Sequence, residues 1–509
     1  MEKVASKVNK NERIRRSILT GNLWKTVIYI TLPLFFYQFI NSFYTLVDQI
    51  MVAQIGDSSV SAVATIAQIK MLLTSLGLGL AGGGAIVVAK LYGAGHIEEA
   101  KRNANTVFIL GLFIIGLDIF VFLPFSDVIL KICQVPEDLI SLSSGYFRLQ
   151  LVEQAIIVLN NIAISIEKSK GNTKVIFVMN ILNMIVKISL SALFVYGIRV
   201  TDLIYIELSS IIAQSSMLVI SLYLLLNKKN IFQISYKYFS LKWENVKTIL
   251  LMSLPLFLGK FVISLGKVSV NAMCKVYGSL TVGALGVSNN ICGLITNCGA
   301  SFEDSESSIV SQNLGNKNMK RTMKVFIVSM ILMAIWTIFG YLCVRVFFQD
   351  QIINLFSTKN TSPDFIKSIK DIFFYDSFSI PALAINSVIL GLLYGYGQTF
   401  LATIVNILRI VTRISTLFIL QTYFPQIGSE AAGISMGISN GIIAIFSICF
   451  FIYFILKIRK KGYKGMSFKD KEPVMVEVDG VLVNEEEAEN IKNERETLNA
   501  NSKIWFKSI

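Results

Sequence analysis

The sequence has few charged residues and a single histidine, and these scarcities exclude several classes of protein. Only 16% of its 509 residues are charged, whereas 53% are hydrophobic, and the mean hydropathy is +0.62. A soluble domain carries about 25% charged residues. The one histidine, His96, stands in the polar stretch "GAGHIEEAKR" and cannot assemble a metal site alone. The composition indicates a membrane protein, for which we expect no metal and no cofactor.

Motifs for disulfides, zinc and enzymatic chemistry are also missing. The six cysteines lie in or beside apolar segments without a Cys-x-x-Cys pair. No G-x-x-x-x-G-K-[ST] loop and no nucleophile motif occurs. The glycine-rich run "GLGLAGGG" at 77–84 lies within an apolar span, where small residues allow close helix packing. We therefore expect that the chain is not an enzyme.

Apolar runs recur from Trp24 to about Leu456, each long enough to cross a hydrocarbon core of about 30 Å as a helix. The alternating ten-residue segments of an outer-membrane barrel are missing. We expect no cleavable signal peptide, because residues 1–22 are basic and polar. The sequence predicts an all-α integral membrane protein with twelve transmembrane helices, at about 24–53, 58–89, 103–125, 139–165, 174–197, 202–226, 246–276, 281–312, 324–348, 366–393, 399–422 and 430–457.

The net charge of +14 does not indicate a nucleic-acid partner, because the basic residues lie mostly in short gaps between apolar runs. Lysine and arginine crowd the N-terminal segment, alternate connections and the stretch 457–464. By the positive-inside rule both termini are expected in the cytoplasm, in a multi-pass protein of the cell membrane. The expected partners are the lipid bilayer and a small molecule, and the chain is expected to be a monomer.

The two halves of the chain are internal repeats. "TLPLF" at 31–35 matches "SLPLF" at 253–257 with a shift of 222 residues, and the same shift superposes Gly93 on Gly315. Each half holds six spans, so the repeats have the same orientation and meet around an axis along the membrane normal. The predicted divisions are an N-terminal segment (1–22), an N-lobe (23–227), a cytoplasmic linker (228–245), a C-lobe (246–457) and a charged cytoplasmic tail (458–509). In the tail, alternation around Asp479–Gly480 predicts a hairpin.

Polar side chains follow one face of two predicted helices. Asn41, Tyr44 and Asp48 are spaced i, i+3, i+7, and Gln38 extends their face. In the fifth span the same spacing recurs at Asn180, Asn183 and Lys187. Such groups turn inward in lipid, toward a partner or a water-filled cavity. They are either a functional site or hydrogen bonds between helices, and Asp48 with Lys187 is alternatively a buried ion pair.

The chain resembles the multidrug and toxic-compound extrusion (MATE) family. The residues that carry the resemblance are "LPLFFYQFINSFYTLVDQIMVAQIG", "GGGAIVVAKLYGAG" with its repeat "SSIVSQNLGNKN", and "KSKGNTKVIFVMNILN". The resemblance implies two six-helix lobes that export cationic or amphipathic drugs in exchange for protons or sodium ions.

The resemblance also implies roles for particular residues. Pro33 matches the proline at which the first helix bends, and Asn41, Tyr44 and Asp48 match a polar set around the cation-coupling carboxylate. Its implied partners are Asn160, Asn183 and Ser210. Lys187 departs from the family, which tends to have an aspartate there. An ammonium near Asp48 favours the ionised carboxylate and repels sodium, so Lys187 either competes with protonation or replaces the ion.

The predicted C-lobe departs as well, since the aligned positions of the family's acids hold Ile263 and Leu383, with Asp376 two turns before the latter. The seventh helix carries Lys260 and Lys267 instead, which we assign to the substrate cavity with Gln38, Asn41, Asn160 and Asn180. Counting about 1.5 Å per residue, Lys260 and Glu303 lie at similar depth, and we predict that they pair. The open alternative is a cavity for an anionic or zwitterionic substrate, which Arg409 and Arg413 favour.

These features lead to one expected function and two alternatives. The expected function is secondary efflux of drugs by proton or sodium antiport through alternating access. The first alternative is a flippase for a lipid-linked or anionic substrate, which the lysines of the seventh helix favour. The second is a non-transporting membrane scaffold whose tail is the working part.

Overall fold

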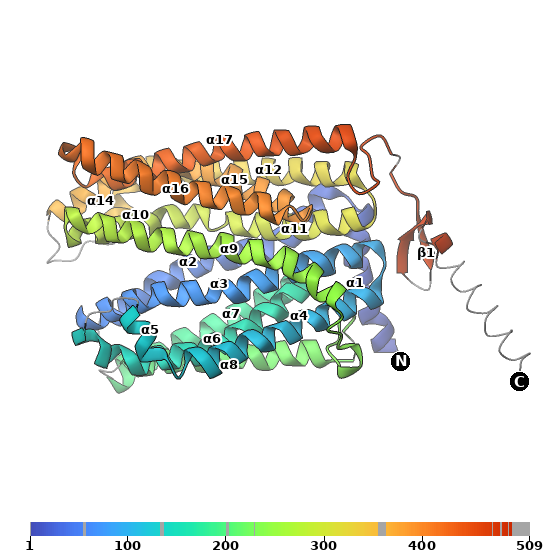
Figure 1. Ribbon diagram of the computed structural model, residues 1–509, viewed down its shortest axis with the longest axis horizontal. Coiled ribbons are helices and arrows are strands. Elements are labelled where there is room, and N and C mark those ends of the chain that lie inside the picture. The colour runs from blue at the N-terminus through green and yellow to red at the C-terminus, as the bar shows by residue number, and fades with distance from the viewer. Residues whose placement is uncertain are drawn as a thin grey trace, which may run out of the picture.

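A computed structural model describes residues 2–53, 57–132, 137–199, 203–228, 230–354, 363–470, 472–478, 481–486 and 488–490. Side chains are described in these ranges except at 2–10, 43–53, 57–68, 137–143 and a few single positions. Long helices run along one common axis and form two layers, with the first described helix (2–20) and the tail segment 475–484 at the same end (Figure 1). We call this the terminal end.

The N-lobe is built from the helices of the first half of the chain. They are α2 (Leu23–Ala53), α3 (Asp57–Ala94), α4 (Ile97–Leu117) with its π-helical extension η1 (Asp118–Phe122), the short α5 (Ser126–Ile132), α6 (Glu137–Ser169), α7 (Thr173–Ala192) with η2 (Leu193–Ile198), and α8 (Leu203–Leu226). Each of the six N-lobe segments predicted from apolar length is helical.

The C-lobe repeats this order after a connection that holds η3 (Tyr236–Tyr238). Its elements are α9 (Trp243–Cys274), η4 (Lys275–Tyr277), α10 (Ser279–Thr296), α11 (Gly299–Gly315), α12 (Met319–Tyr341) with η5 (Leu342–Phe347), α13 (Gln349–Asn354), α14 (Pro363–Asp376), α15 (Ser379–Gly395), α16 (Thr399–Tyr423), η6 (Pro425–Ile427) and α17 (Glu430–Lys461). The C-lobe helices form the upper layer in Figure 1.

Two of the predicted spans are folded as pairs of helices. The segment 366–393 is divided between α14 and α15, which are bent by 46°. The segment 281–312 is divided between α10 and α11. Among the described residues, ten single helices are long and apolar enough to cross a membrane, and the bent pair makes an eleventh. With α10 and α11 as one further segment, the structure agrees with the predicted twelve-helix bundle.

The repeat predicted from the 222-residue shift is visible where α3 and α11 cross. A Cβ added to Gly93 would lie 2.0 Å from the backbone oxygen of Gln312, and one added to Gly315 would lie 1.9 Å from that of Lys90. Lys90 and Gln312 are themselves related by the same shift. The two contacts are therefore equivalent under the pseudo-two-fold axis, and both require glycine.

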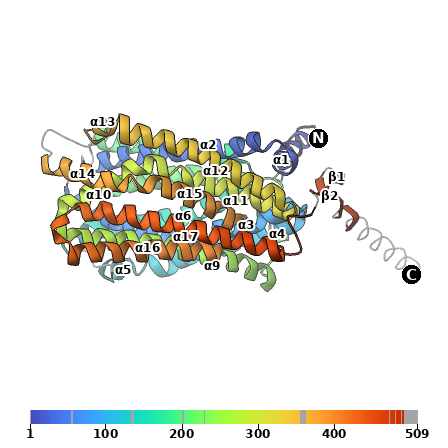
Figure 2. The same cartoon turned by 90° about the horizontal axis from the view of Figure 1, so that it is seen from above.

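The N-terminal helix α1 (Glu2–Thr20) and a hairpin from the tail lie together at the terminal end. The hairpin pairs β1 (Met475–Val478) with β2 (Val481–Asn484) antiparallel, as the alternating pattern predicted. Its backbone is held by Glu12, whose carboxylate accepts a hydrogen bond of 2.9 Å from the Leu482 amide. Figure 2 shows the hairpin outside the end of the bundle.

Arginines attach α1 to both lobes. The buried Arg15 donates from Nε to the Tyr92 carbonyl at 2.8 Å in the N-lobe. From the C-lobe, Arg321 donates to the carbonyls of Ile18 at 2.9 Å and Gly21 at 2.6 Å. Because α1 is bonded to α3 and to α12, it bridges the two lobes at the terminal end.

Candidate functional site

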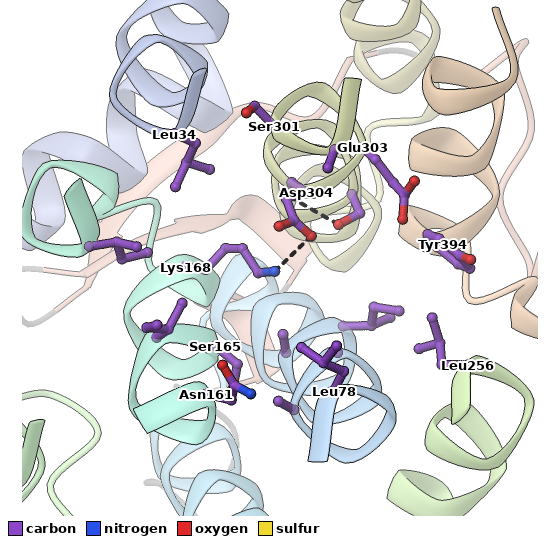
Figure 3. Close-up of a pocket in the computed structure, with 18 of the residues that line it drawn as sticks. Leu34, Leu78, Asn161, Ser165, Lys168, Leu256, Ser301, Glu303, Asp304 and Tyr394 are labelled. Carbon is purple, nitrogen blue, oxygen red and sulfur yellow. Dashed lines mark hydrogen bonds and ion pairs between the residues drawn. The ribbon is translucent and has the colours of Figure 1, made fainter. Parts of the chain in front are cut away.

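A cavity of about 330 Å³ lies between the lobes. It is lined by α2, α3, α6 and α7 of the N-lobe and by α9, α11 and α15 of the C-lobe. The labelled lining residues in Figure 3 are Leu34, Leu78, Asn161, Ser165, Lys168, Leu256, Ser301, Glu303, Asp304 and Tyr394. Its wall combines apolar side chains with charged and amide groups, as expected of a small-molecule site.

Two ion pairs stand in the cavity wall. Lys168 of α6 reaches across the lobe interface to Asp304 of α11, with 2.8 Å between Nζ and Oδ1 (Figure 3). Lys260 of α9 pairs with Glu303 of α11 at 3.4 Å, which confirms the predicted pair. The wall therefore contains two carboxylates and two ammonium groups that already compensate one another.

The lobe interface is closed by hydrogen bonds on the terminal side of the cavity. Ser308 donates to the Lys168 carbonyl at 2.8 Å, and Gln312 donates to the Ser169 carbonyl at 2.8 Å. The hydroxyls of Thr31 and Ser305 are 2.7 Å apart and link α2 to α11. Because all three contacts join opposite lobes, opening this end would break them together.

A second cavity, of about 540 Å³, lies at the terminal end. Ile86 lines both cavities. Lys90 and His96 of the N-lobe and Gln398 and Tyr463 of the C-lobe region contribute to the wall of the second one. A solute leaving the central cavity toward the terminal end would pass the closed interface near Ile86.

Three of the six predicted cavity residues line the central cavity: Gln38, Asn180 and Lys260. The prediction for Asn160 is wrong, because its side-chain amide donates to Gln214 at 3.0 Å and its oxygen accepts from Ser221 at 2.8 Å. These bonds join α6 to α8, and the neighbouring Asn161 lines the cavity instead. The other two predicted residues, Asn41 and Lys267, lie farther along α2 and α9 than the cavity-lining positions.

The predicted coupling residues are only partly described. Tyr44 and Asp48 lie within α2, in the stretch whose side chains are outside the described residues. Asn183 has a buried side-chain oxygen with no hydrogen-bond partner among the described residues. Ser210 is buried and donates to the Ile206 carbonyl of its own helix at 3.4 Å.

The predicted hinge, Pro33, lies inside the continuous helix α2. A proline within a helix removes one backbone hydrogen bond and weakens the helix locally. Pro255 stands at the equivalent position in α9, where its carbonyl accepts a hydrogen bond from Thr403. The hinge role of Pro33 stays a prediction, since it concerns a second conformation.

Sequence reasoning missed a group of charged side chains in the N-lobe interior. Lys70 of α3 forms an ion pair with Glu153 of α6, and both residues interact electrostatically with Glu207 on α8. Both glutamates are buried, and Lys187 interacts electrostatically with each of them. A signal was present, because both glutamates stand inside apolar segments just as Asp48 does.

Asp376 does not take the place predicted for it, because the bend between α14 and α15 separates it from Leu383. Its carboxylate accepts hydrogen bonds of 3.0 Å from Ser288 and from Ser379. Pro381, in the first turn of α15, is the residue that could have indicated this break. The two residues do not share one face of a straight helix.

Comparison with known proteins gives a consistent result. The MatE family model matches residues 33–193 and 255–419, one match in each lobe. The probable multidrug resistance protein YoeA of Bacillus subtilis is 24% identical over 353 residues, 66% of this chain and 74% of its own. The multidrug export protein MepA of Staphylococcus aureus is 20% identical, over 80% of this chain and 89% of its own.

Solved structures agree with the fold. A multidrug resistance MATE transporter in an outward-facing conformation superposes with a TM-score of 0.81 at 19% identity, covering 87% of this chain and 98% of that one. Two six-helix lobes around a shared cavity define a membrane transporter with an internal repeat. The chain belongs to the MATE family of multidrug efflux transporters.

Proposed function

We propose that this chain exports cationic or amphipathic small molecules in exchange for protons or sodium ions, by alternating access. The observation that supports this most is the central cavity, because helices of both lobes line it and hydrogen bonds between the lobes close its terminal side. Rocking of the lobes would exchange those bonds for access from the terminal end. The named relatives, which are multidrug proteins, support the substrate class.

The cavity chemistry is compatible with an amphipathic cation. Glu303 and Asp304 supply negative charge, and Tyr37 and Tyr394 supply aromatic faces over which a cation can be held. Each carboxylate is paired with a lysine, so a cationic substrate would compete with Lys168 or Lys260 for its partner. In this proposal, substrate binding loosens the ion pair that spans the lobes.

The proposed coupling carboxylate is Asp48, with Tyr44, Asn183, Lys187 and Ser210 around it. Losing and regaining its charge would bend α2 at Pro33 and change the shape of the cavity, which α2 lines through Leu34 and Gln38. The chain would act as a monomer in the cell membrane, with the terminal end in the cytoplasm and without a bound cofactor.

Efflux from energised membrane vesicles tests the proposal. Ethidium efflux would be measured for wild type, Asp48→Asn and Lys187→Ala across pH, with and without sodium. Asp48→Asn should abolish gradient-driven efflux, whereas Asp127→Asn, a carboxylate on the exposed helix α5, should leave it unchanged. Normal transport by Asp48→Asn would reject the coupling assignment, and the absence of gradient-driven efflux by wild type would reject the function.

A flippase for a lipid-linked or anionic substrate is the second candidate. It is favoured by Lys168 and Lys260, whose ammonium groups stand in the cavity wall and could hold a phosphate. Binding of an ethidium-type cation and of a lipid pyrophosphate to the purified protein separates the two functions. Saturable binding of the lipid alone would favour the flippase.

A further inference from the structure

Three basic side chains of the C-lobe, Lys267 on α9 and Arg409 and Arg413 on α16, have no carboxylate partner among the described residues. No Asp or Glu oxygen of the described residues lies within 4.0 Å of any of them, whereas Lys168 and Lys260 in the cavity wall each have a carboxylate partner. Lys267 interacts electrostatically with both arginines and with Lys260. Arg413 is buried, and like charges grouped around a buried charge are unfavourable unless an anion compensates them.

The two arginines converge on one oxygen. Arg409 Nε donates to Asn440 Oδ1 at 3.0 Å, and an Nη of Arg413 donates to the same oxygen at 2.8 Å. The two nitrogens are therefore no farther apart than roughly 6 Å, the sum of these two distances. Arg413 is buried and also donates from Nε to Ser439 at 3.1 Å. Neutral amide and hydroxyl groups of α17 thus orient the guanidinium groups without neutralising them.

Helix packing brings Lys267 to the same level as the arginines. Its neighbour Gly266 lies against Ile410 so closely that an added Cβ would be 2.3 Å from the Ile410 side chain. Ile410 follows Arg409 directly on α16. Arg409 keeps both of its terminal nitrogens without a partner among the described residues.

Lys267 points away from the lipid-facing side of α9. Leu251 and Leu258 are exposed on that side. Leu251 precedes Lys260 by nine residues, and Leu258 precedes Lys267 by nine. Nine residues are about two and a half helical turns, which places each lysine on the side opposite its leucine. Lys260 and Lys267 therefore share the opposite face, on which Lys260 lines the central cavity. Lys267 is itself exposed, about 10 Å farther along the helix from Lys260. Its exposed side chain is therefore accessible from the face of α9 that is turned away from lipid.

Asp376 does not fill the role of counter-ion. It is the acid whose charge acts on both arginines, but its two oxygens accept hydrogen bonds from Ser288 and Ser379. Glu303, which acts on Arg409 from farther away, is paired with Lys260. The positive charges of Lys267, Arg409 and Arg413 are thus accompanied by one carboxylate, that of Asp376, which forms no ion pair with any of them.

We propose that Lys267, Arg409 and Arg413 form an oxyanion-binding site of the C-lobe, for the carboxylate or phosphate group of a small molecule. The free terminal nitrogens of Arg409 present the planar fork that matches two oxygens of such a group. Lys267 contributes a third donor from α9. Arg413, four residues after Arg409 on α16, adds a further positive charge. The site goes beyond the proposed export of cations, and binding rather than transport tests it.

Calorimetric titration of the purified full-length protein in detergent, at low chloride, is the first test. The probes are sodium benzoate, its neutral isostere benzamide, and inorganic phosphate. We expect benzoate or phosphate to bind, benzamide to bind at least tenfold more weakly, and Arg409→Gln to weaken oxyanion binding at least tenfold. The matched control is Arg345→Gln, an arginine of the same lobe that lies over the Phe374 ring. Equal binding of benzoate and benzamide, or unchanged binding by Arg409→Gln, would overturn the proposal.

Thermal unfolding gives a second readout, because a ligand that binds only the folded protein raises its unfolding temperature. Without an oxyanion, Arg409→Gln should unfold at the same or a higher temperature than wild type, because it removes like-charge repulsion. Benzoate or phosphate should raise the unfolding temperature of wild type and of Arg345→Gln but not of Arg409→Gln. If Arg409→Gln does not fold, the exposed Lys267→Gln replaces it, with an expected loss of several-fold in affinity; unchanged affinity there would equally reject the site.

Discussion

The two lobes share their helix packing but differ in the charges that they bury. At the crossing of α3 and α11, Gly93 and Gly315 make equivalent contacts. In the interior, the N-lobe pairs Lys70 with Glu153, whereas Arg409 of the C-lobe has no acidic partner among the described residues. The repeat has thus kept the contacts that hold the lobes together and has changed the electrostatics of each interior.

Helices α7 and α16 show this difference in buried charge at equivalent positions. Helices α7 and α16 both begin two residues after a glycine with positive φ, Gly171 at 76° and Gly397 at 70°. Counting sixteen residues from each glycine reaches Lys187 in the N-lobe and Arg413 in the C-lobe. Lys187 has two buried glutamates as electrostatic neighbours, but Arg413 is bonded to neutral groups. The same position therefore balances acids in one lobe and adds net positive charge in the other.

The largest expected effect comes from the shared packing. Gly93→Ala and Gly315→Ala should each destabilise the folded protein by more than about 3 kcal/mol, because the new methyl group meets backbone of the other lobe. Yield of monodisperse protein and its unfolding temperature measure the loss. The two variants should be equally damaging, since their contacts are equivalent.

The controls for this experiment are glycines in open space. Nothing lies within 4 Å of a Cβ added to Gly286 in α10 or to Gly441 in α17. Alanine at either position should be neutral or stabilise the protein by about 0.5–1 kcal/mol, because helical glycine is entropically unfavourable. If Gly93→Ala were tolerated like Gly286→Ala, the close crossing of α3 and α11 would be wrong.

The next effect tests the N-lobe pair. Glu153→Gln should destabilise by about 3 kcal/mol, because it leaves Lys70 facing the second buried glutamate without its main partner. The double variant Lys70→Leu with Glu153→Leu should recover much of that loss, since replacing a whole buried pair is often neutral. Unfolding temperatures of Lys70→Leu, Glu153→Leu and the double variant measure the coupling. Additive losses would show that the two residues do not interact.

Sequence patterns were sufficient for the fold but not for the rotation of individual helices. Apolar length predicted the spans, and the 222-residue shift predicted that Gly93 and Gly315 are equivalent positions. Depth counting along two helices also found the pair of Lys260 and Glu303. The family resemblance, from which Asn160 was assigned, missed the lining residue by one position, because neighbouring residues on a helix point about 100° apart and Asn161 lines the cavity. Glu153 stands out as an acid inside an apolar segment, but its partner Lys70 is 83 residues away in another helix, so no local pattern pairs the two.

A smaller effect distinguishes the two ion pairs of the cavity wall. Lys168–Asp304 spans the lobes, whereas Lys260–Glu303 lies within the C-lobe. Asp304→Asn should therefore shift the population toward opening at the terminal end by about 1 kcal/mol, or roughly fivefold, as Asp304 is partly exposed. Glu303→Gln should leave this equilibrium unchanged. Spin-label distances between α6 and α11 at the terminal end measure it, and equal shifts in both variants would remove the distinction.

The smallest effect compares two equivalent ion pairs at the other end of the lobes. Arg148–Asp127 in the N-lobe and Lys370–Asp350 in the C-lobe have separations of 2.8 and 2.7 Å. Arg148 and Lys370 are related by the 222-residue shift. Both pairs are about half exposed, so neutralising either aspartate should cost less than about 1 kcal/mol, and less still at high salt.

The N-lobe member of these two pairs should also respond to pH. A hydrogen bond from the Ser144 hydroxyl, followed by the charge of Arg148, lowers the pKa of Asp127 in the folded protein. Its stabilising contribution is therefore complete above the unfolded-state pKa of about 3.9 and is lost as the pH falls through the lower folded-state value. Ser144→Ala should raise the folded-state pKa and reduce the dependence of unfolding temperature on pH below about 4. An unchanged pH profile in Ser144→Ala would leave Arg148 as the main cause, and the hydroxyl would have no measurable part in setting the charge of Asp127.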